Sequence, residues 1–384
     1  MEQNAIFSNP LSRQARDIPE FMEVINKNLH FVYLMESITM KEIHDIKKII
    51  ITGCGDSYLA GLAMKPLMEK LTGLEVEDCK NIDLSRYYPS ERLGSTPNNP
   101  LVILISVSGS ISRILEAAQR ANAYGANTLA ITNDKNTPLA KECNRVLELN
   151  TPPVERAPGC SAYVASCFAL LAFCIRVGRV IQSYEPAEED RIRAIAMNYI
   201  RTFSQDVTTP IAEQMRNLAE TWKDLQSFDI VGDSGAFASA QFGAWKFVES
   251  FGGITNAEDS ENWLHENFLY MEPEKIGTVI FADKNSPSYS RCLETAAVMK
   301  RIGRPTLVIT DGNSSDFPEG VTICKIPSAE DYMYNPLMQH IPLLFLGSYI
   351  GEFLGRHYYR EGDGDNWQDS SGVYPIRTSK IVIV

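Results

Sequence analysis

Ten residues decide the fold of this chain: Leu101-Val102-Ile103-Leu104-Ile105-Ser106-Val107-Ser108-Gly109-Ser110. The first five are apolar and three of them are β-branched, which predicts a strand buried on both faces. A hydroxyl-rich turn with one glycine follows, and we then expect an amphipathic helix with Ile111, Leu115 and Ala118 on one face. A buried strand, a tight turn and a helix together make the basic unit of an α/β fold.

Residues 106–110, named the serine turn from here on, have two interpretations. In the first, the hydroxyls and the free N–H groups of the following helix bind a phosphate, because oriented dipoles supply the positive field and no lysine is needed. In the second, one serine only caps the helix, as in an ordinary strand–helix connection. The turn alone is compatible with both, and the rest of the chain has to decide between them.

Length and composition are typical of a globular protein with two domains. The chain has 384 residues, of which 44% are hydrophobic and 22% charged, and its net charge is −12. This acidic balance argues against nucleic acid or an anionic membrane as a partner. The eight cysteines form no C-x-x-C pair and the first residues lack a signal-peptide pattern, so we expect reduced thiols in the cytoplasm. The most apolar stretch, residues 163–181, contains Arg176 and Arg179 and therefore predicts a buried core helix instead of a membrane span.

The chain resembles itself. Residues 48–53 recur as 228–232, 101–105 as 277–281, and 125–132 as 303–310. Each half therefore predicts strand, glycine turn, helix, strand, helix and strand, which makes two doubly wound, flavodoxin-like parallel-sheet subdomains in tandem. The organisation that we expect is a helical arm over 1–44, a first subdomain over 45–190, a second over 191–345, and an extended tail over 346–384.

The two copies differ at the ends of their strands. The first copy has Cys54-Gly55-Asp56-Ser57 and the serine turn, whereas the second has Asp233-Ser234-Gly235-Ala236 and Ala282-Asp283-Lys284. This asymmetry predicts one phosphate site, built mainly by the first copy. No Walker motif, no complete dinucleotide fingerprint and no metal-ligand spacing occurs, so neither a cofactor nor a metal is expected.

Charged residues with helical spacing stand in the second copy. Lys246 and Glu249 share one helix face, and His265 follows in an acidic stretch. The pair is either a surface ion pair worth a few tenths of a kcal/mol or part of a catalytic site. For His340, as for His30 and His44, a structural role suffices.

Four features together resemble the double SIS-domain (sugar isomerase) family, most closely the isomerase domain of glucosamine-6-phosphate synthase and the fructosamine-6-phosphate deglycases. They are the S-x-S-G turn, the C-G-x-S turn at residues 54–57, a K-x-x-E pair followed by a histidine, and a lysine near the end of the sequence, here Lys380. The resemblance extends over about residues 20–384. It implies that Glu249, His265, Lys380 and Lys246 are catalytic. It also implies phosphate binding by hydroxyls and sugar binding by the two turns, with the residues Ser57, Ser106, Ser108, Ser110, Gly55, Asp56 and Gly109.

In the implied mechanism, Glu249 moves a proton between C1 and C2 of a phosphorylated ketose or ketosamine, and partial desolvation is expected to raise its pKa. His265 opens the sugar ring, and Lys380 forms a Schiff base or holds the carbonyl oxygen. The reaction is an aldose–ketose isomerisation, or the deglycation or deamination of a 6-phosphorylated ketosamine. Because the family's histidine comes from a neighbouring subunit, the resemblance also implies a homodimer or larger homo-oligomer with shared sites.

The sequence also departs from the family pattern. Glu266-Asn267 follows the histidine where relatives have Gly-Pro, Ile111 replaces a hydroxyl residue, and Asp56 replaces a threonine. The tail has an insertion around residues 362–371, and we expect no glutaminase half. A sugar-phosphate-sensing regulator without catalysis therefore stays as an alternative, whereas the hydroxyl turn argues against a purely structural module.

Overall fold

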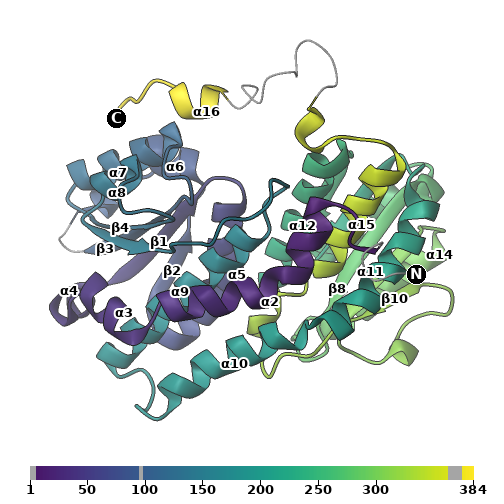
Figure 1. Ribbon diagram of the computed structural model, residues 1–384, viewed down its shortest axis with the longest axis horizontal. Coiled ribbons are helices and arrows are strands. Elements are labelled where there is room, and N and C mark those ends of the chain that lie inside the picture. The colour runs from purple at the N-terminus through teal and green to yellow at the C-terminus, as the bar shows by residue number, and fades with distance from the viewer. Residues whose placement is uncertain (1–5, 95–97, 362–373) are drawn as a thin grey trace. The chain divides into compact units, whose positions relative to one another are not determined.

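The computed structural model describes residues 6–94, 98–361 and 374–384, which form two compact units. Within these ranges, the first-sheet unit comprises 20–94, 98–153, 161–197 and 374–384, and the second-sheet unit comprises 6–19, 154–160 and 198–361 (Figure 1). The predicted helical arm forms α2 (Pro10–Asn28), α3 (Phe31–Ser37) and α4 (Met40–Asp45). Helices α2 and α10 (Glu188–Thr202) each begin in one unit and end in the other. Helix α15 (Ile341–Phe353) crosses the predicted limit between residues 345 and 346. The predicted domain limits themselves stay predictions.

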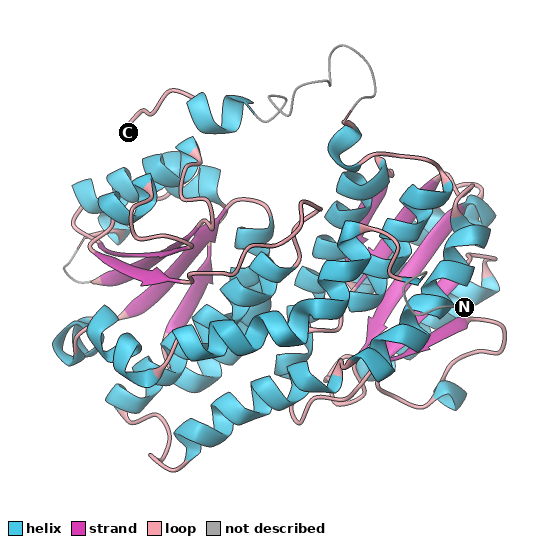
Figure 2. Ribbon diagram, viewed as in Figure 1, coloured by secondary structure: helices cyan, strands magenta, loops and turns pink. Residues whose placement is uncertain are grey.

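The first sheet has five parallel strands in the order β2-β1-β3-β4-β5. Their bounds are β1 (Lys48–Gly53), β2 (Glu75–Asp78), β3 (Pro100–Ile105), β4 (Asn127–Thr132) and β5 (Arg145–Glu148). The connecting helices are α5 (Asp56–Thr72), α6 (Asn81–Arg86), α7 (Ser112–Ala123) and α8 (Pro138–Glu142), followed by α9 (Ser161–Ile181). Figures 1 and 2 show α6, α7 and α8 on one face and α5 and α9 on the other, as right-handed crossovers require.

The second sheet repeats this plan in the order β10-β9-β8-β6-β7. Its strands are β6 (Ser227–Val231), β7 (Thr255–Glu258), β8 (Ile276–Ala282), β9 (Thr306–Thr310) and β10 (Thr322–Lys325). Its helices are α11 (Gln205–Trp222), α12 (Gly235–Phe251), α13 (Ser260–His265), α14 (Tyr289–Arg301) and α15. Read from the other edge, this order is β7-β6-β8-β9-β10, which is the order of the first sheet with each strand number raised by five. The prediction of two doubly wound parallel sheets in tandem is therefore confirmed.

Burial explains why the central strands are apolar throughout. All six residues of β3 are buried, because α7 covers one face of the sheet and α5 and α9 cover the other. The helix after the serine turn is present as α7, and the three residues predicted for its apolar face all belong to or pack against the core. The residues that it buries in the core are Ile114, Ala117, Ala118 and Ala121. Ile111 and Leu115 are only partly buried beside them.

Helix α9 is the long apolar stretch of the sequence. Within the described ranges it alone has the length and apolarity to cross a membrane, and 89% of its most apolar window is buried inside the structure. It packs along α5, and even Arg176 on α9 is buried. The prediction of a core helix is confirmed.

Candidate functional site

The two predicted binding turns lie at the same edge of the first sheet. Strands β1 and β3 are parallel neighbours, with Gly53 paired to Ile105 at their carboxyl ends. In the order β2-β1-β3-β4-β5 the chain changes winding direction between β1 and β3, and in open α/β sheets ligands bind in the crevice outside this point. The Gly55 turn (residues 54–57) leaves β1 there, and the serine turn leaves β3.

The Gly55 turn depends on two glycines. Gly55 has φ 58° and ψ −133°, a conformation that L-residues rarely adopt. A Cβ on Gly53 would lie 2.7 Å from the backbone of Ser57, so only glycine lets α5 begin this close to the strand. Asp56 and Ser57 are half-buried and form the first turn of α5, so a carboxylate and a hydroxyl are both held at the crevice.

The serine turn is tight and internally bonded. The Gly109 N–H donates to the Ser106 carbonyl and to its Oγ, at 3.0 and 3.2 Å. The exposed Ser108 hydroxyl accepts from the Ser110 hydroxyl at 3.3 Å. Gly109 has φ 57°, and a Cβ on it would lie 2.4 Å from the Cβ of Thr137. The turn therefore brings three predicted phosphate ligands into five residues.

The structure excludes the helix-cap interpretation of these serines. The N-cap of α7 is Ile111, and its side chain makes no capping hydrogen bond. The hydroxyls of the serine turn therefore do not cap the N-terminus of α7, whereas the phosphate interpretation is compatible with their geometry.

The equivalent crevice of the second sheet has the same backbone and a different chemistry. Ser234, with φ 54° and ψ −125°, repeats the conformation of Gly55. Asp233 accepts hydrogen bonds from the N–H and the hydroxyl of Ser260, both at 2.8 Å. Burial, together with the charges of Asp311 and Asp233, raises the pKa of Asp283 to about 8. Asp283 is therefore protonated at neutral pH, and the crevice of the second sheet has a buried aspartate where the first sheet has the serine turn.

Lys246 and Glu249 form an ion pair on α12 that is not a surface pair. The Lys246 Nζ lies 2.6 Å from a Glu249 carboxylate oxygen, and the two side chains are 1% and 31% exposed. The ammonium also lies 4.8 Å from the ring centre of Phe242, which packs edge-to-face on His340 at 4.9 Å. Burial lowers the pKa of His340 to about 3, so this ring is neutral beside the ammonium. The surface interpretation is wrong, because the Lys246 side chain is only 1% exposed.

His265 ends α13 and is exposed. Its Nε2 lies 3.0 Å from Glu261, which also pairs with Arg291 at 2.6 Å. The segment that carries it contacts a buried ion pair between Arg304 and Asp229, whose charged atoms lie 3.1 Å apart. Trp263 donates to Asp229, and Arg304 donates to the carbonyl of Asn267, so both ends of this short segment are fixed. The histidine is presented to solvent from a rigid base.

Lys380 lies in the C-terminal segment (residues 379–384), which follows α16 (Tyr374–Thr378). The residue is exposed, and its carbonyl accepts a hydrogen bond from Arg113 on α7. The predicted insertion at 362–371 lies outside the described residues. Lys380 and the predicted residues of the two turns belong to the first-sheet unit, whereas Lys246, Glu249 and His265 belong to the second-sheet unit.

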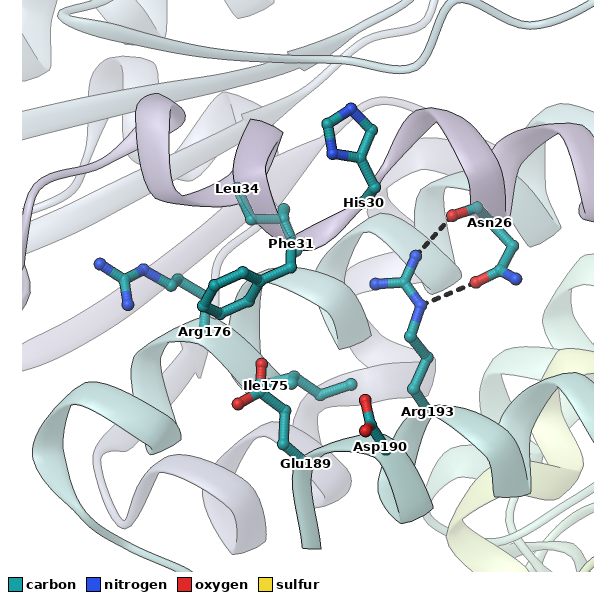
Figure 3. Close-up of a pocket in the computed structure, with 9 residues that line it drawn as sticks. All are labelled: Asn26, His30, Phe31, Leu34, Ile175, Arg176, Glu189, Asp190 and Arg193. Atoms are coloured by element: carbon teal, nitrogen blue, oxygen red, sulfur yellow. Dashed lines mark hydrogen bonds between the residues drawn. The ribbon is translucent and has the colours of Figure 1, made fainter. Parts of the chain in front are cut away.

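A cavity of about 250 Å³ in the first-sheet unit contains none of the predicted residues. Figure 3 shows that it is lined from α2, α3, α9 and α10. The lining contains two arginines, Arg176 and Arg193, and two acids, Glu189 and Asp190, so its formal charges balance, and Arg193 donates to Asn26 at 2.7 and 2.6 Å. Within the described ranges, no group of three His, Cys, Asp or Glu side chains is arranged to hold a metal ion.

Comparison with known proteins finds a family model that matches part of the chain. Residues 42–176 match the SIS domain family model. This SIS domain contains both turns and the whole first sheet. The chain is also 24% identical over 314 residues to the isomerizing glutamine–fructose-6-phosphate aminotransferase of Thermotoga maritima, covering 78% of this chain and 48% of that protein. The corresponding Aquifex aeolicus protein is 24% identical over 353 residues, covering 88% and 55%. The chain thus spans about half the length of the curated relatives it matches.

Solved structures share the fold over almost the whole chain. The C-terminal domain of glucosamine-fructose-6-phosphate aminotransferase from Francisella tularensis matches with a TM-score of 0.79 and 16% identity, covering 92% of this chain and 98% of that one. Tagatose-6-phosphate ketose/aldose isomerase from Escherichia coli gives 0.69 and 15%, covering 92% and 95%. Glucosamine-6-phosphate deaminase from Thermotoga maritima gives 0.66 and 18%, covering 93% and 97%. At these identities the likeness is one of fold, and both sheets take part in it.

Proposed function

We propose that this protein is a phosphosugar isomerase-type enzyme with two SIS domains, which abstracts a proton at C1 or C2 of a phosphorylated sugar or amino-sugar. The observation that carries the proposal is the Lys246–Glu249 pair, a buried ammonium holding a partly exposed carboxylate at 2.6 Å. The SIS domain match supports it, as do relatives named for fructose 6-phosphate, glucosamine 6-phosphate and tagatose 6-phosphate.

In this proposal the phosphate binds at the switch point of the first sheet. The hydroxyls of Ser57, Ser106, Ser108 and Ser110 donate to its oxygens, and the first-turn N–H groups of α7 add their dipoles. Gly55 and Gly109 keep the backbone close to the ligand. Asp56 accepts from sugar hydroxyls, which a carboxylate can do while it would repel phosphate.

The chemical step needs a base in its ionised form. The Glu249 carboxylate takes the proton from C1 of the open-chain ketose, the C1–H electron pair forms the C1–C2 double bond, and O2 takes a proton from solvent to give an enediol. The same group then returns the proton to C2 while O1 releases its proton to solvent, which gives the aldose without any external oxidant or reductant. With a ketosamine, the same abstraction gives an enaminol; protonation at C2 turns it into an imine at C1, and water hydrolyses this imine to release the amine, which is the deglycase or deaminase variant of the proposal.

Lys380 and His265 complete the proposed site. Lys380 forms a Schiff base with the carbonyl or holds its oxygen, and His265 moves the proton of the ring oxygen. The exposure of His265, 66% of its side chain, suits a residue that acts in the site of a second copy. We therefore propose a homodimer or larger homo-oligomer with shared sites.

A sugar-phosphate-sensing regulator is the second candidate function. It is favoured by Asp56 and by Ile111 at the N-cap of α7, where a hydroxyl would have been a further phosphate ligand. A sensor needs the turns but has no use for the buried Lys246–Glu249 pair, so the two functions differ in an observable step.

Exchange of the C1 proton of fructose 6-phosphate in D₂O, followed by NMR, tests the proposal. The wild type is expected to exchange this proton, and Glu249→Gln should lower the rate by about 10²–10⁴-fold because it removes the base. Glu220→Gln, on the exposed face of α11, is the matched control and should exchange like the wild type. Near-native exchange in Glu249→Gln would remove this residue from the mechanism. Binding without exchange in the wild type would establish the sensor.

A further inference from the structure

We infer that Glu116 is a positioning residue, which fixes the C-terminal segment to α7 and thereby places Lys380 relative to the serine turn. The inference rests on the proposed function for the role of Lys380. We name four residues along α7 and its C-cap the clasp: Arg113, Glu116, Arg120 and Tyr124. Every contact described next lies within the first-sheet unit.

The Glu116 carboxylate is fully buried and has three donors. Arg86 donates to it at 3.0 Å, Arg113 pairs with it along the helix, and the Val382 N–H donates to it at 2.6 Å. Burial alone would raise the pKa of Glu116, but these hydrogen bonds outweigh it and hold the pKa below its usual range. Burial of an unpaired carboxylate would be strongly destabilising. The three donors compensate for the burial of Glu116, and one of them comes from the C-terminal segment.

The rest of the clasp fixes the segment on both sides of Val382. Arg113 donates to the carbonyl of Lys380 itself. Arg120 and Tyr124 donate to the carbonyl of Val384 at 2.9 and 3.2 Å. The four side chains follow one another at spacings of three and four residues, so they form one stripe along α7. The segment is therefore held at three backbone positions without forming a strand or a helix.

The position of the stripe gives it a functional meaning. Helix α7 begins directly after the serine turn, and Arg113 lies in its first turn. The residue that holds the Lys380 backbone thus lies in the first turn of the helix that follows the serine turn, while the Lys380 side chain stays exposed.

Holding the backbone matters because Lys380 has a long, flexible side chain. A Schiff base, or an oxygen held in the transition state, requires its Nζ within bonding distance of the carbonyl, and misplacement by about 1 Å can cost 10²-fold in rate. Phosphate binding by the serine turn does not need the segment. Loss of the clasp should therefore lower kcat and leave KM nearly unchanged.

Two variants break the clasp from opposite sides. Glu116→Gln removes the charge that Arg86, Arg113 and Val382 share, and Val382→Pro removes the N–H donor while Glu116 stays intact. The matched controls are Glu142→Gln, on the neighbouring helix α8, and Ile383→Pro, one residue further along the segment. The probe is C1-proton exchange on fructose 6-phosphate, with hydrogen–deuterium exchange of the amides at 379–384 as a readout independent of activity.

We expect both clasp variants to lower kcat at least 10-fold with KM within about 3-fold, and Glu116→Gln to lose protection of the Val382 amide, while both controls keep wild-type values. Glu116→Gln should also add nothing to Lys380→Gln, because the two act through one group. Unchanged kcat, a rise in KM alone, or additive losses would overturn the inference. If the wild type exchanges no C1 proton, the proposed function fails. Protection of the Val382 amide then decides the clasp by itself: lost protection in Glu116→Gln supports it, and retained protection overturns it.

Discussion

At the scale of single residues, Ser234 occupies a backbone conformation that glycine occupies at the equivalent place in the first sheet. Its φ of 54° and ψ of −125° bring its Cβ into a region that costs an L-residue about 1–2 kcal/mol. We predict that Ser234→Gly raises the free energy of unfolding by about 1 kcal/mol and Tm by roughly 2–4 °C. Urea titration and calorimetry measure both quantities.

Ser288→Gly is the matched control, because Ser288 has an ordinary φ of −88° in the same unit. Glycine there relieves no strain and adds freedom to the unfolded chain, so this variant should be no more stable than the wild type. Equal effects of the two substitutions would show that the conformation of Ser234 is not strained.

Asp283 makes stability depend on pH. Its pKa is about 8 in the folded protein, raised by burial and by Asp311 and Asp233, and about 3.9 in the unfolded chain. The folded protein therefore holds a proton that the unfolded chain has released. This stabilising contribution is fully present below pH 4 and is lost as the pH rises to 8. In the wild type, this group should lower the free energy of unfolding by about 1.4 kcal/mol for each pH unit in this window. We predict that Asp283→Asn removes this pH dependence.

The measurement is the free energy of unfolding of wild type and variant at pH 5, 6 and 7.5. The groups facing Asp283 are Asp311, Asp233, the buried Tyr199 hydroxyl and the amides of Asn335 and Gln339, and these amides are neutral neighbours that an asparagine can bond. Asp224→Asn, at an exposed position between α11 and β6, controls for the change in net charge. Parallel curves for Asp283→Asn and wild type would contradict the prediction.

At the scale of elements, the serine turn is set by one glycine. Gly109→Ala would force an alanine into φ 57° and its Cβ to within 2.4 Å of Thr137. We predict a loss of about 2–4 kcal/mol in unfolding free energy, from the backbone conformation and the overlap together, and loss of phosphate binding. Gly73→Ala has a similar φ of 64° but no atom within 4 Å of the added Cβ, so it should cost only about 1 kcal/mol. Equal costs in urea titrations would show that the contact with Thr137 is not limiting.

The elements that the sequence reveals are those buried on both faces. Strands β1, β3, β4, β6, β8 and β9 were all found as apolar runs, because parallel central strands leave no polar face. The four edge strands were missed, since each has only four residues and is polar and partly exposed. Their sequences are protected against edge pairing by charge, which also removes the apolar signal.

The clasp on α7 was missed for a related reason. Its spacing is helical, but Arg113, Glu116 and Arg120 resemble the solvated face of an ordinary amphipathic helix. Nothing in the local pattern shows that Glu116 is buried by Arg86 and by the C-terminal segment. A contact across 266 positions depends on tertiary folding, and only the structure supplies it.

At the scale of the whole molecule, the two sheets keep one topology while their crevices diverge. The strand order is the same in both, yet the family model matches only residues 42–176. The serine turn at the switch point of the first sheet corresponds to Ala282-Asp283-Lys284 in the second, and Cys54 of the Gly55 turn corresponds to Asp233. The sequence repeat therefore predicted the architecture, and the differences between the copies are the basis of the proposal that phosphate binds at the first sheet. The surface interpretation of Lys246 failed because burial of a lysine by Phe242 and α15 is not visible in sequence.

Shared sites make a prediction for the assembled protein. If each site takes Glu249 from one copy and His265 from another, a mixed dimer of Glu249→Gln and His265→Asn contains one site with both residues intact and one with neither. Random exchange of subunits makes half of the dimers mixed, so an equal mixture of the two inactive variants should recover about one quarter of the wild-type rate of C1-proton exchange. The mixture is measured after dissociation and reassembly, against each variant treated alone. Recovery requires exposure of His265 on a fixed segment, which the Arg304–Asp229 pair provides. If both residues act within one copy, every dimer carries a defect in each site and the mixture stays as inactive as its parts.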